Sequence, residues 1–444
     1  MGRRPVGVLK LVEKLILSDN LETKQQLGKK IFDLAYKKGV YASSINALYL
    51  ARGKEEFPPN FTVPAINLRT LTLDLARAIF RVARKNNAGA FIFEIARSEM
   101  GYTSQPPIEY TSVILAAAVQ EGYQGPVFIQ GDHFQLNAKK FTANAEQEIE
   151  GLITLIGQAV DAGFYNIDID SSTLVDLSKK KIEKQQYSNY NTCAKITQFI
   201  RKVQPRGIEV SVGGEIGEVG GKNSTPEELR AFMSGFKNRL RKGKQGISKI
   251  SVQTGTSHGG VVLPDGSIAK VSIDFDTLRD LSRIARKEFG LAGCVQHGAS
   301  TLPAEAFHKF VDVETCEVHL ATDFQNMVYE SAHFPADLKS RIYEWIKQNL
   351  ASENKPGQTE EQFIYKTRKK ALGPFKNEIM SISQETRDAI VKPIEDKFDF
   401  LFKQLNVVNT KELTDKYISL KRVIKRVHQQ KKQTGEQEQF DGAD

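Results

Sequence analysis

The feature that most constrains the fold of this chain is a regular alternation of apolar runs and helical patterns between about residues 58 and 335. Each short apolar run is typical of a buried strand, and each segment after it carries apolar residues at helical spacing. The predicted strand–helix pairs are 61–67 with 72–87, 88–96 with 109–123, 125–132 with 144–164, 165–170 with 191–205, 207–216 with 226–243, 248–254 with 274–289, 292–298 with 303–311 and 316–321 with 323–334. Such alternation implies a parallel sheet.

The eight units predict an α/β fold, a closed (β/α)8 or TIM barrel. An open doubly wound sheet is the alternative, but the first strand–helix turn lacks the G-x-G-x-x-G of dinucleotide-binding folds. Helical patterns before and after the barrel predict additions at both ends. We expect a helical N-terminal extension over 1–57, the barrel over 58–335, a helical C-terminal extension over 336–430 and a disordered tail over 431–444.

Composition excludes several classes of protein. The chain has 444 residues, 40% of them hydrophobic and 26% charged, as in a globular protein with a sizeable core. No apolar run approaches the roughly 18 residues that a membrane span needs. Glu13 and Lys14 interrupt the apolar part of the N-terminus, which argues against a signal peptide. The three cysteines, none in C-x-x-C spacing, form neither a disulfide framework nor a cysteine zinc site, so we expect a cytoplasmic protein.

The net charge of +9 concerns possible partners. Part of it lies in the stretch SLKRVIKRVHQQKKQ near the C-terminus. A solvated basic helix is the favoured interpretation, and contact with nucleic acid is the minor one, because the stretch shows no recognisable nucleic-acid-binding module and no interleaved aromatic residues. A positive field also suits an enzyme for phosphorylated anions.

Acids and histidines follow the predicted strands at their carboxyl ends, where barrels of this kind carry their chemistry. The strand ends place Glu94, Asp132, His133, Asp168, Asp170, Glu215, His258, His297 and His319 on one rim. Neutral imidazole is a common ligand for borderline metals, and three protein ligands plus an open position is the arrangement of a catalytic zinc site. The rim therefore predicts a metal site built on His133, His258 and His297.

The acids of the rim have several possible parts in such a site. Glu215 and the pair Asp168 and Asp170 are expected to supply a fourth ligand, a second metal position or the groups that orient the imidazoles. The role of His319 is open, because its strand end faces the same rim. Structural roles remain the alternative for each residue taken singly.

Two histidine–glycine turns suggest a phosphate subsite. In both SHGG and HGAS a glycine follows the histidine, and the chain then turns toward a predicted helix. Backbone N–H groups in such turns can bind phosphate, and the loops after the last two barrel strands are a frequent phosphate site. Ser300 and Thr322 would add hydroxyl donors. An ordinary strand–helix turn is an equally weighted interpretation.

Five ordered motifs over roughly residues 60–330 resemble the class II, metal-dependent fructose-bisphosphate aldolases: GDHF, GFYNIDIDSS, GGEIGEVGG, GTSHGG and QHGAS. The stretch EIARSEMGYTSQPP also resembles a segment of the accessory subunit of tagatose-bisphosphate aldolase, a relative in the same superfamily. The resemblance implies a zinc-dependent aldolase that cleaves a phosphorylated ketose, most simply fructose 1,6-bisphosphate, into glycerone phosphate and glyceraldehyde 3-phosphate through a metal-stabilised enediolate. We expect a homo-oligomer with no membrane partner; cobalt, manganese or iron are alternatives to zinc.

The resemblance also implies roles for residues of this chain. His133, His258 and His297 would hold the zinc ion, with Glu215 and Asp170 as further acids of the metal region. Asp132 would move the proton on the hydroxyl formed at the attacked aldehyde carbon. A substrate phosphate would be bound by Gly259, Gly298 and Ser300, beside the hydroxyl donor Thr322 suggested above.

The sequence departs from the family pattern at two places. The family's GG is usually followed by an acidic run that supplies a mobile base, whereas here Lys222 and Asn223 follow, leaving Glu218 as a nearby candidate. The family's NIDT at the last strand is replaced by HLAT, with His319 and Ala321 in place of an asparagine and an aspartate. A non-catalytic accessory or scaffold subunit of the tagatose-bisphosphate type is therefore the alternative function.

Overall fold

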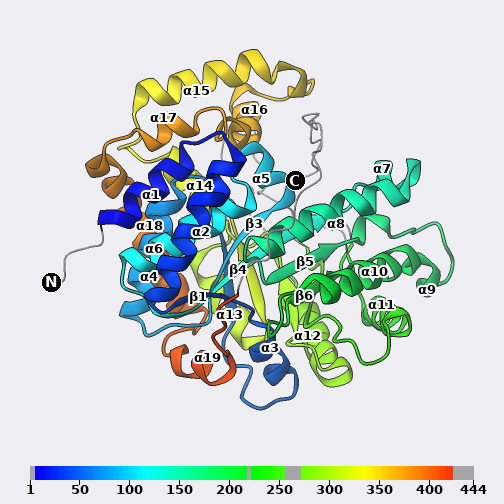
Figure 1. Ribbon diagram of the computed structural model, residues 1–444. Helices are drawn as coiled ribbons and strands as arrows, with labels where there is room; N and C mark the ends of the chain where they lie inside the picture. The colour runs from blue at the N-terminus through cyan, green and yellow to red at the C-terminus, as the bar shows by residue number, and fades with distance from the viewer. Residues whose placement is uncertain (1–5, 218–221, 256–271, 424–444) are drawn as a thin grey trace.

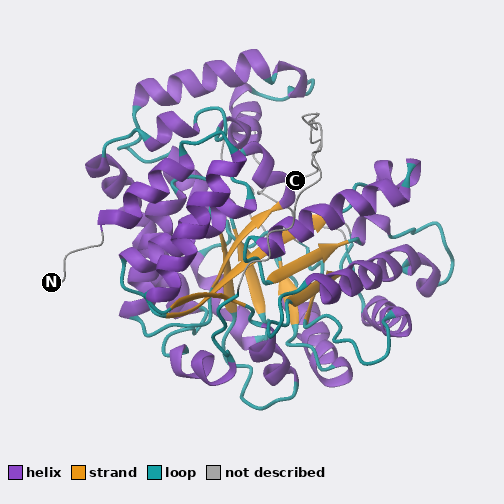
Figure 2. Ribbon diagram, in the orientation of Figure 1, coloured by secondary structure: helices purple, strands orange, loops and turns teal. Residues whose placement is uncertain are grey.

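A closed barrel of parallel strands forms the centre of the protein (Figures 1 and 2). The computed structural model describes residues 6–217, 222–255 and 272–423. The barrel strands are β2 (Val63–Asn67), β3 (Ile92–Ala96), β4 (Gly125–Gln135), β5 (Asn166–Asp170), β6 (Ser211–Glu215), β7 (Lys249–Ser251), β8 (Cys294–Gln296) and β9 (Glu317–Leu320). The ring closes because β4 pairs with both β3 and β5 while β2 pairs with β9. The predicted TIM barrel is confirmed.

Helices surround the strands, as the alternating pattern predicts (Figure 2). The elements between barrel strands and after β9 are α4 (Thr72–Lys85), α5 (Arg97–Tyr102), α6 (Pro107–Gln120), α7 (Ala138–Ala143), α8 (Ala145–Asp161), η1 (Ser172–Leu174), α9 (Ile182–Gln185), α10 (Tyr187–Val203), α11 (Pro226–Arg239), α12 (Phe275–Phe289), η2 (Ala304–Ala306), α13 (Phe307–Asp312) and α14 (Thr322–Tyr329).

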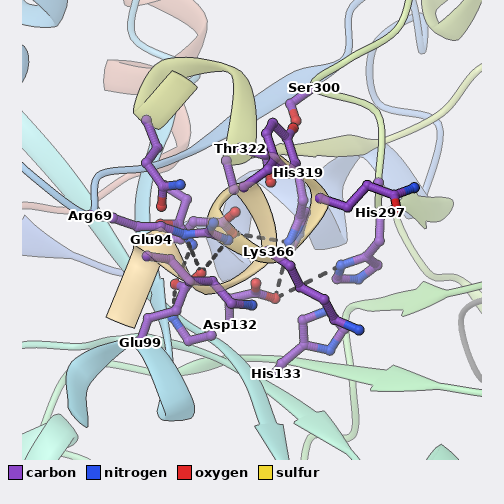
Figure 3. A pocket seen from close by; sticks show the side chains of 18 of the residues that line it. Arg69, Glu94, Glu99, Asp132, His133, His297, Ser300, His319, Thr322 and Lys366 are labelled. Carbon is purple, nitrogen blue, oxygen red and sulfur yellow. Dashed lines mark hydrogen bonds and ion pairs between the residues drawn. The ribbon is translucent and has the colours of Figure 1, made fainter. Parts of the chain in front are cut away.

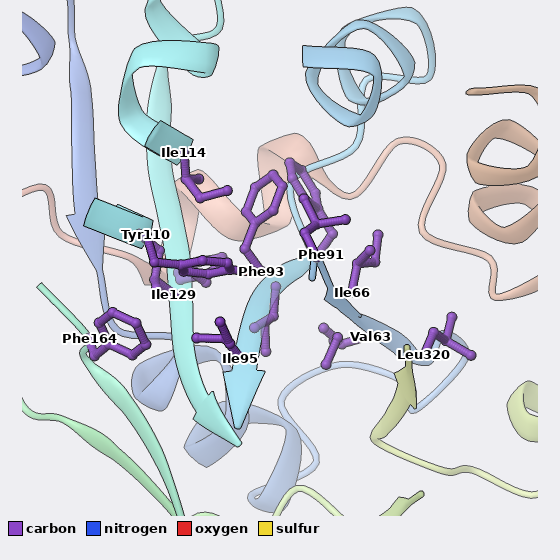
Figure 4. Close-up of a cluster of buried hydrophobic side chains, with 14 of the residues drawn as sticks. Val63, Ile66, Phe91, Phe93, Ile95, Tyr110, Ile114, Ile129, Phe164 and Leu320 are labelled. Carbon is purple, nitrogen blue, oxygen red and sulfur yellow. The ribbon is translucent and has the colours of Figure 1, made fainter. Parts of the chain in front are cut away.

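The main core lies between the barrel wall and its helices. Outward-facing side chains of the strands meet the apolar faces of the helices, as Figure 4 shows for Phe93, Ile95 and Ile129 beside Tyr110 and Ile114 of α6. All of these side chains are buried, and burying a large apolar side chain contributes about 1.5–3 kcal/mol. This shell leaves the inward-facing strand positions free to carry polar chemistry.

The N-terminal extension contains a strand that the sequence analysis did not predict. Residues 6–53 form α1 (Val6–Ile16), α2 (Leu21–Lys37), β1 (Val40–Ser43) and α3 (Asn46–Gly53). Strand β1 pairs in parallel with β4 outside the ring. Residues 40–43 are therefore a strand and not part of a helix, contrary to the prediction for 1–57. The Asn166 side chain supports this addition, because its Oδ1 accepts a hydrogen bond from the Ile45 backbone N–H at 2.9 Å.

A buried arginine ties this extension to the barrel. Arg52 of α3 is only 1% exposed, and its guanidinium donates hydrogen bonds to the backbone carbonyls of Phe61, Ala292, Glu314 and Thr315. These carbonyls precede β2, β8 and β9, so one side chain connects three strand entrances.

The C-terminal extension runs along the outside of the barrel. It comprises α15 (Ala336–Asn349), η3 (Ala351–Glu353), α16 (Glu360–Thr367), η4 (Arg368–Ala371), α17 (Lys376–Met380), α18 (Gln384–Gln404) and α19 (Lys411–Tyr417). Helices α15, α16 and α17 lie together at one end of the molecule, and α19 lies beside α3 near the other (Figure 1). Within the described residues, no helix has both the length and the apolarity to cross a bilayer. The predicted tail 431–444 lies outside the described residues.

Replacement of Arg52 by leucine is expected to lower the free energy of unfolding by about 3 kcal/mol or more, because four buried carbonyls lose a charged donor. Denaturant unfolding followed by circular dichroism measures the change. Arg206→Leu, at an exposed position, is the matched control and should lie within about 0.5 kcal/mol of wild type. Equal stability of the two variants would show that α3 does not anchor the barrel.

Candidate active site

The GDHF stretch at the end of β4 departs from regular strand geometry. The pairing of β4 with β5 shifts in register between Gly131 and Phe134, which is a bulge, and His133 has a φ of +38°. Bulges redirect side chains, and positive φ is strained for a residue other than glycine. A Cβ on Gly131 would lie 2.5 Å from the Phe134 ring, so only glycine allows this ring to fold back. The motif thus turns His133 into the barrel mouth.

Two acids from neighbouring strands flank His133. Its Nδ1 lies 3.3 Å from Asp170 Oδ2 and 3.8 Å from Glu215 Oε2. Asp170 is itself fixed, because its Oδ1 accepts hydrogen bonds from the Ser172 backbone N–H and hydroxyl, and its Oδ2 accepts one from Gln135. An imidazole held in this way through Nδ1 presents Nε2 as the atom available to a metal.

Two further histidine rings lie in a row with that of His133, each tilted relative to the next. The ring centroid of His297, just after β8, lies 4.3 Å from that of His133 and 4.1 Å from that of His319 on β9. His297 Nε2 lies 3.1 Å from Ser251 Oγ, and its Nδ1 lies 4.0 Å from Asp132 Oδ1. Strands β4, β8 and β9 therefore bring three imidazoles and the Asp132 carboxylate into one buried group.

His319 is surrounded by carboxylates. Its Nδ1 lies 3.0 Å from Glu94 Oε2 and 3.1 Å from Asp132 Oδ1, and its Nε2 lies 2.7 Å from Glu317 Oε1. Burial acts to lower the pKa of His319, but Glu94 and Asp132 outweigh it and raise the pKa well above its usual range. Burial acts to raise the pKa of Asp132, but His133 and His319 outweigh it and hold the pKa well below its usual range.

The other acids of the mouth have the opposite tendency. Burial raises the pKa of Glu94 well above its usual range, with only partial relief from His319. Burial and the neighbouring Asp170 raise the pKa of Glu215 in the same way. The site therefore contains acids whose ionised form is favoured and acids whose protonated form is favoured. This combination is typical of catalytic centres.

Below the histidines, a lysine lies inside the barrel. Lys249 of β7 is 1% exposed, and its Nζ contacts Asp168 Oδ2 at 2.9 Å, Gln130 Oε1 at 2.7 Å and the Glu317 carboxylate. Burial disfavours its charge, but Asp168 and Glu317 outweigh burial and raise its pKa. An ammonium group paired with two buried carboxylates is a poor amine nucleophile, so this geometry does not favour a Schiff base at Lys249.

A cavity of about 530 Å³ opens over this group (Figure 3). Its floor includes Asp132, His133, His297 and His319. Three of the predicted phosphate-binding residues, Gly298, Ser300 and Thr322, line the same cavity. The volume is within the range of small-molecule sites. Two of the predicted metal ligands and three of the predicted phosphate-binding residues thus border a single pocket, although their roles remain predictions.

Four groups of described residues present ligand atoms within 4.8 Å of one another, as metal binding requires. They are Asp132 with His133 and His297, Glu94 with Asp132 and His319, His133 with Asp170 and Glu215, and Asp168 with Glu317 and His319. The first group contains two of the three predicted zinc histidines, and the third contains the two predicted accessory acids. His258, Gly259 and Glu218 lie outside the described residues.

Some residues in the pocket, and some below it inside the barrel, were not singled out from sequence. Lys249 and Glu317 lie within predicted strands. Their side chains can be placed inside the barrel only once it is known which positions of each strand face inward. Arg69, Lys355 and Lys366 line the pocket itself. The two lysines come from the C-terminal extension, and nothing local in the sequence connects that segment to the barrel mouth.

The match of the chain to a family model agrees with this geometry. The model of the class II fructose-bisphosphate aldolases matches residues 57–406, which is most of the chain. The protein therefore belongs to the class II fructose-bisphosphate aldolase family. Among curated proteins, none matches the sequence at a significant level.

Solved structures share the fold at low sequence identity. A protein titled a probable tagatose 6 phosphate kinase from Sinorhizobium meliloti 1021 has a TM-score of 0.55 at 15% identity, over 80% of this chain and 98% of its own. A fructose-bisphosphate aldolase from Campylobacter jejuni has a TM-score of 0.48 at 19% identity, over 84% and 96%. The YdjI aldolase from Escherichia coli K12 has a TM-score of 0.41 at 13% identity, over 78% and 99%. The first likeness supports the barrel fold alone.

Replacement of Lys249 by methionine is expected to lower the free energy of unfolding by about 3–5 kcal/mol, because Asp168 and Glu317 lose their buried counter-charge. Adding Glu317→Gln to the same variant should recover part of the loss. Denaturant unfolding measures both, with the exposed Lys29→Met as the matched control. A loss below about 1 kcal/mol would show that the network does not stabilise the barrel.

Proposed function

We propose that this protein is a zinc-dependent aldolase that reversibly cleaves a phosphorylated ketose, with fructose 1,6-bisphosphate as the leading substrate. The observation that carries the proposal is the juxtaposition of Asp132, His133 and His297 at the floor of the pocket. Membership of the class II aldolase family supports it. The products would be glycerone phosphate and glyceraldehyde 3-phosphate.

The donor set fits a borderline divalent metal. His133 and His297 would hold the ion with His258, and Asp170 and Glu215 would orient or supplement the imidazoles. When bound, such an ion polarises a ketone carbonyl and makes the adjacent carbon more acidic. Zinc is the preferred candidate because the ligands are imidazoles; cobalt, manganese or iron are alternatives.

Asp132 would carry out the proton transfer at the hydroxyl of the substrate. In cleavage, its carboxylate takes the hydroxyl proton, the adjacent carbon–carbon bond breaks, and the electron pair passes to the ketone fragment, which is then protonated on carbon. His133 and His319 favour the ionised form of Asp132, which is the form that can accept a proton. The Nδ1 atom of His319 lies 3.1 Å from Asp132 Oδ1 and would hold the carboxylate in position.

One phosphate of the substrate would be bound at the turn after β8. Gly298 and Ser300 follow His297 directly, and Thr322 begins α14 on the adjacent side of the pocket. The positive φ of +68° at Gly298 is favoured by glycine. Hydroxyl and backbone donors of this kind suit a phosphate close to the metal.

Replacement of His297 by alanine is expected to abolish stoichiometric zinc and to lower turnover by about 10²-fold or more, because the charge stabilisation supplied by the metal is lost. Metal analysis and cleavage of fructose 1,6-bisphosphate, with and without a chelator, measure both effects. His308→Ala, an exposed histidine on α13, is the control. Unchanged metal content and turnover would contradict the proposed metal site; His258→Ala should behave like His297→Ala.

Replacement of Asp132 by asparagine is expected to reduce turnover by about 10²–10⁴-fold while zinc is retained, because the amide cannot accept the hydroxyl proton. Steady-state kinetics and metal analysis on the same preparation separate the two effects. Asp276→Asn, on the exposed face of α12, should leave both unchanged. A wild-type protein that binds no metal and cleaves no phosphorylated ketose would instead favour the accessory-subunit alternative.

A further inference from the structure

Cleavage needs a second proton transfer besides the one assigned to Asp132. When the carbon–carbon bond breaks, the carbon of the ketone fragment keeps an electron pair and must take a proton from an acid within hydrogen-bond reach. After the GG motif this chain has Lys222 and Asn223 in place of an acidic run. Lys222 pairs with Glu228 at 2.7 Å, and Asn223 donates to Asp274 at 3.0 Å. Among the described residues, this segment therefore supplies no acid to the pocket.

Three carboxyl side chains line the cavity within the described part of the chain: Glu94, Glu99 and Asp132. Both oxygens of Glu99 are engaged. Its Oε1 accepts a hydrogen bond from Arg69 Nε at 2.6 Å, and its Oε2 accepts one from the Ala96 backbone N–H at 2.7 Å. Because Asp132 serves the hydroxyl of the substrate in the proposed reaction, Glu94 is the acid that is left for the carbon.

Glu94 is held through one of its two carboxyl oxygens. It belongs to β3, is only 1% exposed and lies beside Asp132 in the pocket (Figure 3). Its Oε2 lies 3.0 Å from His319 Nδ1 and accepts a hydrogen bond from Gln130 Nε2 at 3.2 Å. Its Oε1 has no hydrogen-bond partner among the described residues. A buried oxygen without a partner destabilises the fold, and such atoms call for a functional explanation.

His319 brings the two acids together. Its Nδ1 lies 3.0 Å from Glu94 Oε2 and 3.1 Å from Asp132 Oδ1. The two proton transfers of the reaction take place at neighbouring carbons of the substrate, so two carboxyl groups side by side match them. His319 stands where the family pattern has an asparagine. The chain thus combines the loss of the loop acids with an imidazole that orients a carboxyl group at the floor of the pocket.

The surroundings of the two acids favour opposite protonation states. Burial disfavours the charge of Glu94 and raises its pKa well above the usual range. At Asp132 the effect of burial is outweighed by His133 and His319, which favour the ionised form. Cleavage starts from this combination, because one carboxylate must accept the hydroxyl proton while one carboxylic acid gives a proton to carbon.

We propose that Glu94 is the catalytic acid that protonates the carbon of the ketone fragment in cleavage, and the base that removes the same proton in condensation. The inference rests on the proposed aldolase function and deepens it. In cleavage, Asp132 takes the hydroxyl proton and the carbon–carbon bond breaks. The electron pair left on the ketone fragment then forms a carbon–hydrogen bond with the proton of Glu94 Oε1. Glu94 becomes a carboxylate, and the enzyme is restored when Asp132 gives its proton to water and Glu94 takes one from water.

The first test is the exchange of hydrogen for deuterium at the reactive carbon of glycerone phosphate, followed by NMR in deuterium oxide. This exchange needs no carbon–carbon bond. Glu94→Gln is expected to lower its rate by about 10²-fold or more, because an amide neither gives nor takes this proton. Zinc content should match the wild type, since Glu94 is not a predicted metal ligand. Glu150→Gln, at an exposed position of α8, is the matched control. An unchanged rate in Glu94→Gln would overturn the proposal.

A second measurement separates carbon protonation from bond cleavage. Hexacyanoferrate(III) accepts electrons from the carbanion of the ketone fragment, so cleavage continues in its presence even when protonation is blocked. With this oxidant, Glu94→Gln should release glyceraldehyde 3-phosphate from fructose 1,6-bisphosphate within about threefold of the wild-type rate. Asp132→Asn should behave in the opposite way, keeping the exchange and losing the cleavage. Equal losses of both reactions in Glu94→Gln would indicate a structural role and overturn the proposal.

Two further variants keep the proposal open to disproof. Glu94→Asp retains the carboxyl group but withdraws it by one methylene, and it replaces the glutamine variant if that variant does not fold. Its exchange rate should fall about tenfold while oxidant-supported cleavage is retained. Glu218→Gln examines the acid of the GG segment, which lies outside the described residues. Loss of exchange in Glu218→Gln but not in the Glu94 variants would overturn the proposal.

Exchange and cleavage by the wild type separate this inference from the proposed reaction. Exchange that depends on Glu94, in a protein that cleaves no phosphorylated ketose, would support the role of Glu94 and contradict the aldolase. Cleavage together with exchange that does not depend on Glu94 would support the aldolase and overturn the role of Glu94. Absence of exchange in the wild type would also overturn it.

Discussion

A protonated lysine held between two carboxylates inside the barrel is the interaction on which the geometry of the site depends. Lys249 contacts Asp168 and Glu317, which connects β5, β7 and β9 across the barrel axis. Glu317 in turn contacts His319, and His319 contacts Asp132. Burying an unpaired ionised group costs several kcal/mol. Each residue in the series from Lys249 through Glu317 and His319 to Asp132 is therefore stabilised by the contact with its neighbour. The orientation of Asp132 is thus determined from below the pocket.

The contacts around His133 explain how its strained backbone conformation is tolerated. Its positive φ costs on the order of 1 kcal/mol, and such strain persists only where the surroundings over-determine the conformation. Here the Phe134 ring closes over Gly131 on one side, and Asp170 meets the imidazole on the other. The bulge that places His133 beside His297 is therefore stabilised by core packing and by a carboxylate that is itself fully hydrogen-bonded.

Periodicity alone was sufficient for the barrel, because strand and helix periods alternate without interruption and parallel strands put their carboxyl ends on one rim. The same rule groups Asp132, His133 and His297 from the sequence alone. It could not identify β1, because four residues between two helical patterns are too few to show a period. Nor could it identify Lys366, whose place in the pocket depends on the tertiary contacts of the nearby Arg368. The partners of Lys249 required the strand phase, which a three-residue strand does not reveal.

The docking of the C-terminal segment has a consequence for the order in which a nascent chain acquires its structure. The Thr410 hydroxyl accepts hydrogen bonds from the backbone N–H groups of Gly89 and Ala90, across 321 and 320 residues. A ribosome making this chain completes every barrel strand before it makes either the part of the C-terminal extension that lines the pocket or this contact at the entrance to β3. The packing around the barrel is therefore complete only after the last helices have been synthesised, and contacts of such long sequence separation form slowly. A nascent chain that ends after β9 exposes the apolar side chains that α18 covers in the finished protein, and exposed apolar surface of this kind promotes aggregation.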